Sequence, residues 1–390
     1  MWSRGRKRSH WKVAVLPGDG IGPEVMAVTV RALKALAEGG GPDLELVEFP
    51  WPSHAWHREH GESMPSDWRK RLASHDAILL GALGDPGPAD DPDRYLLPDG
   101  ISLQPLLAIR KGFDQWACER PALLLDGAPQ YIRDDRARDV DMLVIRENSE
   151  GEYVGQGGRL RPGTASEVAT QMEVFTRFAA ERIFRHAFER AAARAAERES
   201  GDRANREFPL SGGGTARAQV CLITKRNALQ YWGDMYTEVF AEVAKDYPAI
   251  AVHHELVDAA CMKFVTSPWA FDVVVASNLQ GDILTDLAAV LCGGMGVAPS
   301  CNLNPSDRHQ PPMFEPTHGS APDIAGKNLA GPAAMLLTAV MMLDWMGEED
   351  QRARRAAARL REAVEADLRA HGESRRSTSD VGDAVIAALA

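Results

Sequence analysis

Residues 12–36, KVAVLPGDGIGPEVMAVTVRALKAL, contain the pattern from which the fold class follows. Residues 12–16 are a short apolar run rich in Val, which predicts a buried strand. Pro17 and three glycines interrupt this run, and Pro23 then opens an amphipathic stretch to about Leu36 that predicts a helix. The order is strand, turn and helix, which is the repeating unit of an α/β protein.

The same alternation recurs along the chain. We expect further strands over residues 77–80, 140–145, 220–223, 250–256 and 272–276, and helices over 172–198, 227–246, 330–346 and 350–371. Segment 199–217 is polar, rich in glycine and without periodicity, so we expect an exposed, mobile loop there. The 390 residues are enough for two packed domains of the α/β class.

Composition excludes several classes of protein. A formal net charge of -11 argues against a nucleic-acid-binding surface, although a few arginines can still gather around an anionic ligand. The five cysteines are scattered and show no CxxC spacing, which argues against a disulfide framework or a zinc knuckle. No apolar stretch is long enough for a secretory signal or a membrane span. We therefore expect a cytoplasmic protein without nucleic-acid or membrane partners.

Two aspartates four residues apart are the strongest chemical signal. Asp282 and Asp286 lie in NLQGDILTDLAAV, directly after the predicted strand DVVVAS. At this spacing they share a helix face at the carboxyl end of a strand, where open α/β sheets bind ligands. Carboxylates suit Mg²⁺ or Mn²⁺, but acids near a helix N-terminus also complement the helix dipole, so spacing alone leaves both interpretations open. Asp258, which follows another predicted strand, is the candidate third ligand.

Three arginines and two proton-transfer candidates also end apolar segments. Arg110, Arg120 and Arg146 could together bind a dicarboxylate, because each guanidinium binds a carboxylate bidentately. Taken singly, each arginine favours a surface salt bridge over a ligand contact. Tyr153 and Lys225 follow strands in the same way and could supply the acid and the base of a proton transfer.

Two glycine-rich segments are candidate ligand loops. The turn LPGDGIGPE (16–24) would let a ligand approach the backbone at a helix N-terminus, but a purely structural tight turn explains it equally well. It is not a GxGxxG fingerprint, because the third glycine comes one residue early, so a Rossmann-type site is not indicated. The segment EPTHGSAPDIAGKN (315–328) is broken by Gly and Pro and is typical of a ligand-binding loop.

Taken in order, these motifs resemble the β-decarboxylating dehydrogenases, a family that includes isocitrate, 3-isopropylmalate, homoisocitrate and tartrate/D-malate dehydrogenases. The resemblance runs from about residue 12 to 346 and includes LPGDGIGPE, AIRKGFDQWACERP, IRENSEGEY, TKRNAL, VDAACM, NLQGDILTDL and EPTHGSAPDIAGKN. EGEYVGQGGRLRPGT followed by VFTRFAAERIFRHAFE is most similar to the tartrate/D-malate branch.

The resemblance implies an isopropylmalate-dehydrogenase-like open α/β fold, in which two domains share a long mixed sheet, rather than a Rossmann fold. The first domain would be discontinuous, over residues 1–115 and 293–390, and would carry the cofactor loops. The second, over 116–292, would carry the dimer contacts and the metal and catalytic residues. The active form would be a homodimer with shared active sites.

The resemblance also implies a role for each matched residue. Arg110, Arg120 and Arg146 would hold the substrate carboxylates, while Asp282 and Asp286 would bind Mg²⁺ or Mn²⁺ together with Asp258 of the partner subunit. Lys225, also from the partner, would be the general base, and Tyr153 would protonate the enol left after CO₂ departs. The residues expected to bind NAD are His318, Gly319, Ser320, Ala321, Pro322, Asp323, Ile324 and Asn328.

The expected reaction is the NAD- and metal-dependent oxidation, with decarboxylation, of a small 2-hydroxy diacid, D-malate or tartrate. 3-Isopropylmalate is the alternative, because Leu103, Leu106 and Leu107 could accept its branched side chain. A non-catalytic, NAD-binding regulatory paralogue is an alternative from another class, although retention of both Lys225 and Tyr153 argues against it. Two departures from the family pattern, Gln280 for an aromatic residue and Gly331 for an Asn, bear on activity and NAD affinity.

Overall fold

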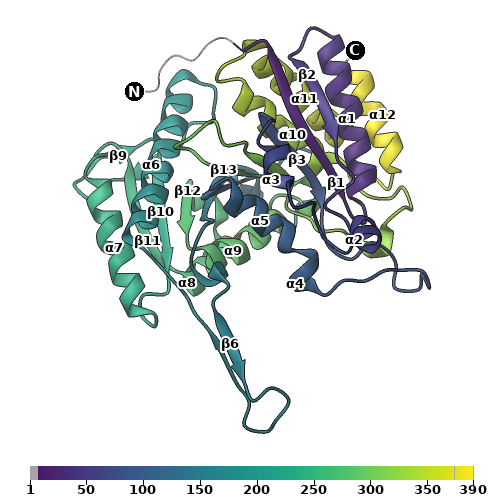
Figure 1. The fold of residues 1–390 in the computed structure, drawn as a ribbon. Coiled ribbons are helices and arrows are strands. Elements are labelled where there is room, and N and C mark those ends of the chain that lie inside the picture. The colour runs from purple at the N-terminus through teal and green to yellow at the C-terminus, as the bar shows by residue number, and fades with distance from the viewer. Residues whose placement is uncertain (1–7, 373, 390) are drawn as a thin grey trace. The chain divides into compact units, whose positions relative to one another are not determined.

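The computed structural model describes residues 8–372 and 374–389, which form two compact units. Unit 1 comprises the described residues up to Gln115, Leu124–Arg133 and those from Cys292 onward, and unit 2 comprises Trp116–Leu123 and Asp134–Leu291. Figure 1 shows the elements of both units.

Residues 124–133 belong to unit 1, although the prediction placed them within the second domain. The reason is local packing. Leu125 joins the apolar core of unit 1, and Gly127, with a φ of 86°, lies so close to α11 (Gln351–His371) that an added Cβ would stand 2.1 Å from the carbonyl oxygen of Leu368. Ten residues without periodicity gave no sign of this contact in the sequence.

Unit 1 contains a five-stranded mixed sheet. Its strands run in the order β13 (Pro299–Leu303), β14 (Met313–Pro316), β3 (Ala77–Ala82), β1 (His10–Gly18) and β2 (Asp43–Glu48). β13 and β14 are antiparallel, and the remaining neighbours are parallel. The strands predicted over 12–16 and 77–80 are confirmed as β1 and β3.

The helices of unit 1 complete its core. They are α1 (Gly22–Glu38), α2 (His54–His60), α3 (Trp68–Leu72), α4 (Asp99–Ser102), α5 (Gln104–Gly112), α10 (Ala333–Met346), α11 and α12 (Thr378–Ala388), with short 3-10 turns at η4 (Met295–Val297) and η5 (Pro322–Ile324). α10 is apolar on nearly every face and is buried along its length, as expected for a central helix.

Unit 2 has a mixed sheet of the same kind. Its strands follow the order β11 (Ala251–Leu256), β10 (Gln219–Thr224), β12 (Val273–Ala276), β5 (Asp141–Glu147) and β4 (Ala117–Leu123). All neighbours are parallel except β4 and β5. Two small hairpins stand apart from the sheet, β6 (Gly157–Leu160) with β7 (Val168–Gln171) and β8 (Phe208–Pro209) with β9 (Thr215–Ala216).

Helices flank the sheet of unit 2. They are α6 (Arg177–Ser200), α7 (Gln230–Ala244), α8 (Val257–Thr266) and α9 (Asn278–Leu291), with 3-10 turns at η1 (Asp135–Asp139), η2 (Glu152–Val154) and η3 (Pro268–Ala270). Mixed sheets flanked by helices confirm the predicted open α/β class. Across the described ranges, no helix combines the length and the apolar character that crossing a membrane requires.

The helix predicted over 172–198 begins later, at Arg177. Thr176 caps it by accepting a hydrogen bond from the backbone N–H of Ala179 at 3.1 Å. The preceding residues run into the hairpin instead, where β7 pairs with β6. A cap of this kind fixes the start of a helix more sharply than hydrophobic periodicity does.

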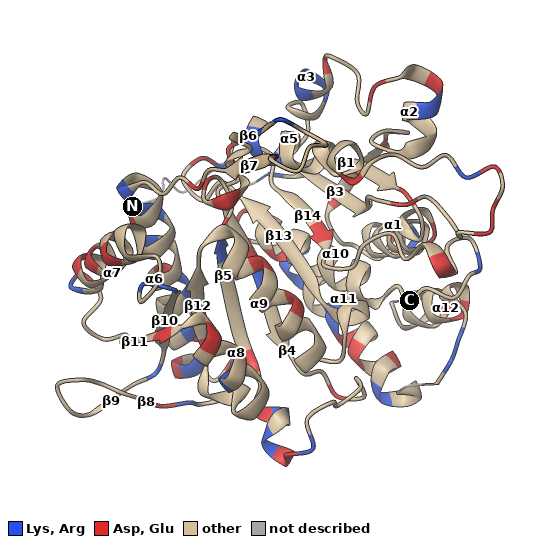
Figure 2. Cartoon of the chain, turned by 90° about the horizontal axis from the view of Figure 1, so that it is seen from below, with Lys and Arg blue, Asp and Glu red and all other residues tan. Residues whose placement is uncertain are grey.

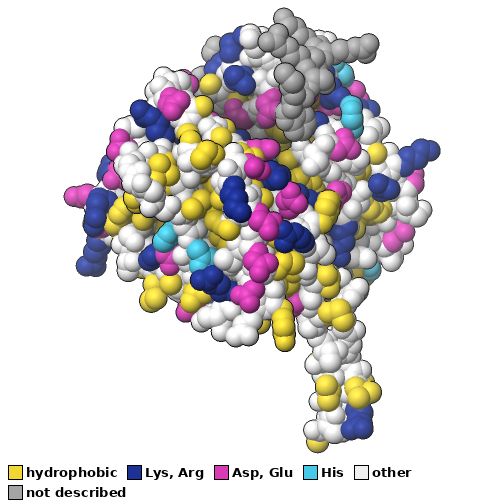
Figure 3. Space-filling view, turned by 90° about the vertical axis from the view of Figure 1, so that its left-hand side faces the viewer, with side chains coloured by type: hydrophobic (Ala, Val, Ile, Leu, Met, Phe, Trp, Pro, Cys, Tyr) yellow, Lys and Arg dark blue, Asp and Glu magenta, His cyan; other side chains and the backbone are white. Residues whose placement is uncertain are grey.

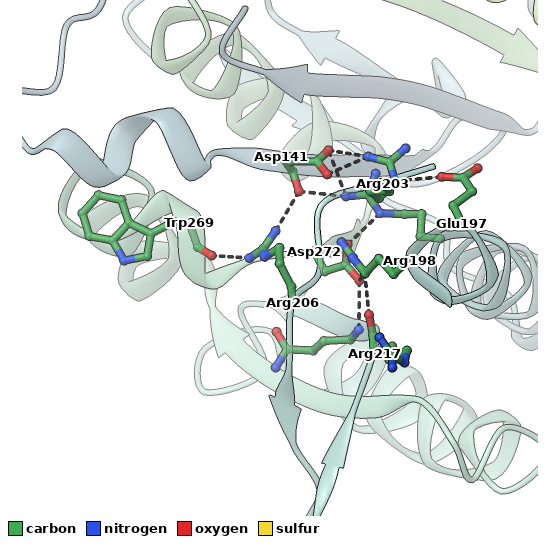
Figure 4. Close-up of polar contacts among 10 residues, drawn as sticks. Asp141, Glu197, Arg198, Arg203, Arg206, Arg217, Trp269 and Asp272 are labelled. Carbon is green, nitrogen blue, oxygen red and sulfur yellow. Dashed lines mark hydrogen bonds and ion pairs between the residues drawn. The ribbon is translucent and has the colours of Figure 1, made fainter. Parts of the chain in front are cut away.

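Segment 199–217 is largely exposed, as predicted, but it is anchored rather than free. Arg203 donates to both carboxylate oxygens of Asp141 at 2.7 and 2.6 Å, and Arg206 donates to the backbone carbonyls of Asp141 and Trp269. Figure 4 shows these contacts beside Asp272, a fully buried carboxylate. Side-chain charge, which hydropathy periodicity does not register, ties this segment to the sheet.

Candidate active site

Asp282 and Asp286 lie on one face of α9, as their spacing predicts. α9 begins directly after β12, so its first turns stand at the carboxyl end of a central strand. Gly281 lets this turn approach β5 closely, because an added Cβ would stand 2.8 Å from the Cβ of Arg146. Figure 2 shows the acidic positions of α9 beside the strands of unit 2.

Asp282 is the centre of a cluster in unit 2. One carboxylate oxygen, Oδ1, pairs with Arg146 and lies 3.5 Å from a guanidinium nitrogen of Arg120. The other, Oδ2, accepts a hydrogen bond of 3.1 Å from the hydroxyl of Tyr153. Arg120 also lies 3.6 Å from a carboxylate oxygen of Asp286. Five predicted residues of unit 2 therefore meet in one place.

The strands explain why two arginines reach the same carboxylate. In the antiparallel pair β4–β5, Cys118 is opposite Arg146, and Arg120 is two residues further along β4. Because side chains alternate between the faces of a sheet, both arginines project from the same face, toward α9.

Two residues that the sequence interpretation missed hold these arginines. The side-chain oxygen of Asn278 accepts hydrogen bonds from Nε and Nη2 of Arg146 at 2.9 and 2.8 Å, and the hydroxyl of Thr285 accepts one of 2.7 Å from Arg120. Both lie in the same stretch as the aspartates, at i−4 and i+3 from Asp282, and this helical spacing was the available signal.

Asp286 carries a raised pKa. Partial burial is the largest cause, and the neighbouring charge of Asp282 adds to it, while Arg120 and Arg146 act in the opposite direction. A bound cation would relieve the repulsion between the two carboxylates. The donor set of two adjacent carboxylates therefore fits a hard divalent ion.

Lys225 and Asp258 form a separate pair in unit 2. Lys225 follows β10 and Asp258 lies in the first turn of α8 after β11, so both stand at the carboxyl ends of neighbouring parallel strands. The Lys225 Nζ atom donates to Asp258 at 2.8 Å, and this hydrogen bond lowers the pKa of the Asp258 carboxyl. Within residues 8–372 and 374–389, no three His, Cys, Asp or Glu side chains are grouped to hold a metal ion. Asp258 is thus not brought to Asp282 and Asp286 within this chain.

Arg110, the third predicted arginine, lies in unit 1 near the end of α5. It is buried and donates a hydrogen bond of 2.6 Å to Glu315, whose same oxygen accepts one of 2.8 Å from Asn302. Glu315 and Asn302 come from β14 and β13. Their partnership with Arg110 spans about 200 residues and gave no signal in the sequence.

The predicted cofactor residues form one loop of unit 1, after β14. Ser320 is buried against the glycine turn, where the backbone N–H of Ile21 donates to its carbonyl at 2.9 Å. A Cβ at Gly20 would stand 2.1 Å from that same carbonyl oxygen, so this glycine serves close packing of protein on protein. In the loop itself, Nε2 of His318 is buried and has no hydrogen-bond partner among the described residues, which fits a site completed by a ligand.

Gln280 and Gly331, the two departures from the family pattern, have different surroundings. Gln280 is buried in the first turn of α9, and its side-chain oxygen has no partner among the described residues. Gly331 is exposed just before α10, with open space where a side chain would stand.

Comparison with known proteins places this arrangement in a family. The model of the isocitrate/isopropylmalate dehydrogenase family matches residues 12–205 and 210–387. The chain is 42% identical over 375 residues to a 3-isopropylmalate dehydrogenase of Thermobifida fusca, covering 95% of this chain and 96% of that protein. It is 40% identical over 381 residues to a decarboxylating D-malate dehydrogenase of Escherichia coli, covering 96% and 97%.

Structure gives the same answer. The crystal structure of an isocitrate dehydrogenase from Methylococcus capsulatus matches with a TM-score of 0.76 and 28% identity over 97% of this chain and 99% of that one. The chain therefore belongs to the isocitrate/isopropylmalate dehydrogenase family and is a decarboxylating dehydrogenase.

Proposed function

We propose that this protein oxidises a small 2-hydroxy diacid, D-malate or tartrate, with NAD and a divalent metal ion, and that decarboxylation follows. The observation that carries the proposal is the Asp282 carboxylate, which Arg120, Arg146 and Tyr153 share beside Asp286. A diacid needs cationic partners for its carboxylates, and oxidation of its hydroxyl needs groups that take and return protons nearby.

Metal binding would use carboxylates from two chains. Asp282 and Asp286 of one subunit and Asp258 of the partner would hold Mg²⁺ or Mn²⁺, which when bound would stabilise negative charge developing on the substrate oxygens. The position of Asp282 and Asp286 on one face of α9 supports metal binding by these two carboxylates. Among the described residues of its own chain, Asp258 belongs to no group of three metal ligands, which agrees with a ligand supplied to the partner's site.

The arginines would bind and orient the diacid. Arg120 and Arg146 are held by Thr285 and Asn278, so their guanidinium planes are fixed before the substrate arrives. Arg110, held by Glu315, would supply the third contact. Rigid guanidinium groups of this kind reduce the entropy lost when a dicarboxylate binds.

Proton transfer would use Lys225 and Tyr153. Nζ of Lys225, from the partner subunit, would accept the proton of the substrate hydroxyl as the hydride leaves for NAD. Tyr153 would donate its phenolic proton to the carbon that has lost CO₂. The Tyr153 hydroxyl lies 3.1 Å from Asp282, and this supports its place at the reacting centre.

NAD would lie on the loop from His318 to Ile324, where the exposed Asp323 would repel the 2′-phosphate of NADP. The unpartnered Nε2 of His318 supports a ligand at this loop. Gln280 and Gly331 depart from the family pattern, and we still expect them to affect activity and the affinity for NAD.

A homodimer would bring the two halves of the site together. α8 and α9 pack on each other, and they expose large apolar side chains at Met262, Val265, Leu279, Ile283 and Val290, of which Met262 is 64% and Ile283 56% exposed. Apolar residues gathered on two adjacent helices are typical of a subunit interface. The β6–β7 hairpin, which projects as a narrow arm, leaves further strand edges free to pair (Figures 1 and 3).

3-Isopropylmalate is the second candidate substrate. Leu103, Leu106 and Leu107 precede Arg110 by seven, four and three residues, which places them on its side of α5 or at the start of that helix. Leu103 is 44% exposed and could contact a branched substrate. The similar identity to 3-isopropylmalate and D-malate dehydrogenases keeps this candidate beside the first.

A substrate panel tests the proposal. D-malate, tartrate, 3-isopropylmalate and isocitrate are each offered with NAD and Mn²⁺, and NADH formation is followed with and without EDTA. We expect the highest kcat/KM with D-malate or tartrate and complete loss in EDTA. Preference for 3-isopropylmalate would establish the second candidate, and binding of NAD without turnover of any acid would indicate a regulatory paralogue.

A further inference from the structure

The last residue of the cofactor loop, Asn328, is bound to the C-terminal helix α12. Its side-chain N–H donates to the hydroxyl of Ser379 at 2.8 Å, and its side-chain oxygen accepts from the backbone N–H of Ser379 at 3.0 Å. Its backbone carbonyl accepts a third bond, of 3.0 Å, from the N–H of Thr378. Both ends of the carboxamide are therefore engaged by groups of the protein itself.

These bonds satisfy groups that α12 cannot satisfy itself. The first N–H groups of a helix have no partner within the helix. Ser377 caps one of them, because its hydroxyl accepts from the N–H of Asp380 at 3.1 Å, and Asn328 takes those of Thr378 and Ser379 from outside. The hydroxyl of Thr378 adds a buried bond of 2.7 Å to the carbonyl of Ala330.

The loop end is also held from the opposite side. The backbone N–H of Asn328 donates to Glu24, in the first turn of α1, at 3.1 Å. α12 is itself fixed on α1, through an ion pair of 2.6 Å between Arg31 and Asp383 and through Gly382, whose Cβ position would be 2.7 Å from Val28. Asn328, with a left-handed φ of 57°, is thus secured between the N-terminal turns of two helices.

We propose that Asn328 is a positioning residue, and that α12 is a structural part of the cofactor site. Asn328 fixes the end of loop 318–328 through Ser379, and its carboxamide does not contact the cofactor. This replaces the expectation that Asn328 binds NAD directly. The inference rests on the proposed function in one respect, which is that NAD lies on this loop.

NAD titration of a small set of variants tests the proposal. Asn328→Gly removes the carboxamide without straining the left-handed backbone, and Ser379→Ala removes the hydroxyl partner. We expect each substitution to raise the Kd for NAD by roughly three- to tenfold. The double variant should bind NAD no more weakly than Asn328→Gly alone, because both substitutions break the same side-chain bond between Asn328 and Ser379. Ser379→Thr, which keeps a hydroxyl, should restore binding.

Ser377→Ala is the matched control. It removes a cap from the same helix and a 3.1 Å hydroxyl contact with Ser379, but both side-chain bonds between Asn328 and Ser379 remain. The helix should therefore lose stability while the Kd for NAD stays at the wild-type value. If Asn328→Gly weakens binding while Ser379→Ala does not, or if the two effects add, Asn328 contacts the cofactor and the proposal is overturned.

Hydrogen exchange of the protein without NAD separates this proposal from the proposed function. Ser379→Ala should speed exchange of the amides over residues 320–328, and Ser377→Ala should not. Unchanged exchange in Ser379→Ala overturns the positioning role whatever NAD does. A wild-type protein that fails to bind NAD, with exchange still coupled to Ser379, would refute the cofactor assignment and with it the place of α12 in a cofactor site.

Discussion

At the scale of single residues, three side chains share the Asp282 carboxylate. Arg120, Arg146 and Tyr153 all contact it. In the proposed reaction the same carboxylate binds a metal ion and the same arginines bind substrate. The arginines must therefore leave Asp282 for the diacid before its charge is fully available to the metal, and this exchange links the two binding events.

If arginines and a metal ion compete for Asp282, removing one arginine should increase the affinity for the metal. Arg120→Gln removes a cation that lies 3.5 Å from Asp282 and 3.6 Å from Asp286, so Mn²⁺ alone should bind about three- to tenfold more tightly than to wild type. Binding of D-malate should weaken at the same time. Calorimetric titration with Mn²⁺ and with each acid measures both, and weaker Mn²⁺ binding would contradict the competition.

Asp323 provides a second test at this scale. Its exposed carboxylate is predicted to exclude NADP by charge, so Asp323→Ala should raise kcat/KM for NADP by about tenfold. Steady-state rates with NAD and NADP measure the change. Lys327, which donates to the backbone carbonyl of Asp323 at 2.8 Å, should keep the local turn intact. An unchanged preference would place the adenosine ribose elsewhere.

At the scale of elements, β4 contributes to the candidate site with one face and is anchored to α6 by the other. Arg120 faces α9, while the neighbouring Glu119 is buried against α6, where it lies 2.7 Å from Nε2 of His186 and 3.2 Å from Nε of Arg190. Burial on its own would raise the pKa of Glu119, but the charge of Arg190 and the hydrogen bond and charge of His186 lower it from 4.5 to about 2. β4 is thereby fixed to α6.

A carboxyl group whose pKa is lower in the folded state than in the unfolded state stabilises the fold at any pH above its unfolded-state pKa. This stabilisation is lost as the pH falls to the folded-state pKa. Glu119→Gln should therefore lower the free energy of unfolding by about 3 kcal/mol near neutral pH, and its difference from wild type should shrink between pH 4.5 and 2. Urea unfolding across this range measures it. Glu181→Gln, which breaks an exposed pair with Arg185, is the control and should cost less than about 0.5 kcal/mol. A difference independent of pH would contradict the pKa shift.

The anchored segment 199–217 is also tested at this scale. Arg203→Ala breaks the contact with Asp141 at the amino end of β5, whereas Lys225 and Arg146 stand at carboxyl ends of strands. We expect faster hydrogen exchange over 201–217 and unchanged kcat and KM, with the exposed Ser211→Ala as control. Altered kinetics would show that the segment reaches the site.

The elements also show what sequence patterns can and cannot predict. Six strands and five long helices follow from apolar periodicity, and helical spacing places Asp282 and Asp286 on one face of α9. The meeting of Arg120, Arg146 and Tyr153 at Asp282 was implied only by the family resemblance. Features that escaped prediction include the strands β2, β4, β13 and β14, the membership of residues 124–133 in unit 1, and the partners Glu315 and Asn302 of Arg110. Each of these depends on contacts between residues far apart in the chain, which local periodicity does not encode.

At the scale of the whole molecule, one chain holds the parts of the proposed site in separate groups. Asp282, Asp286 and Tyr153 lie in one cluster, and Lys225 and Asp258 form another pair. The described residues of a single chain offer no group of three metal ligands. A homodimer in which each site takes Lys225 and Asp258 from the partner would join these parts into one shared active site.

Subunit complementation tests whether two chains share each active site. Lys225→Ala and Asp282→Asn are each expected to be inactive as homodimers, so the two variants are co-expressed and the mixed dimer is assayed with D-malate, NAD and Mn²⁺. A shared site predicts recovery of roughly a quarter of wild-type activity, because half of randomly paired dimers are mixed and each of these regains one intact site. Mixed dimers that form but remain inactive would show that each chain builds its site alone.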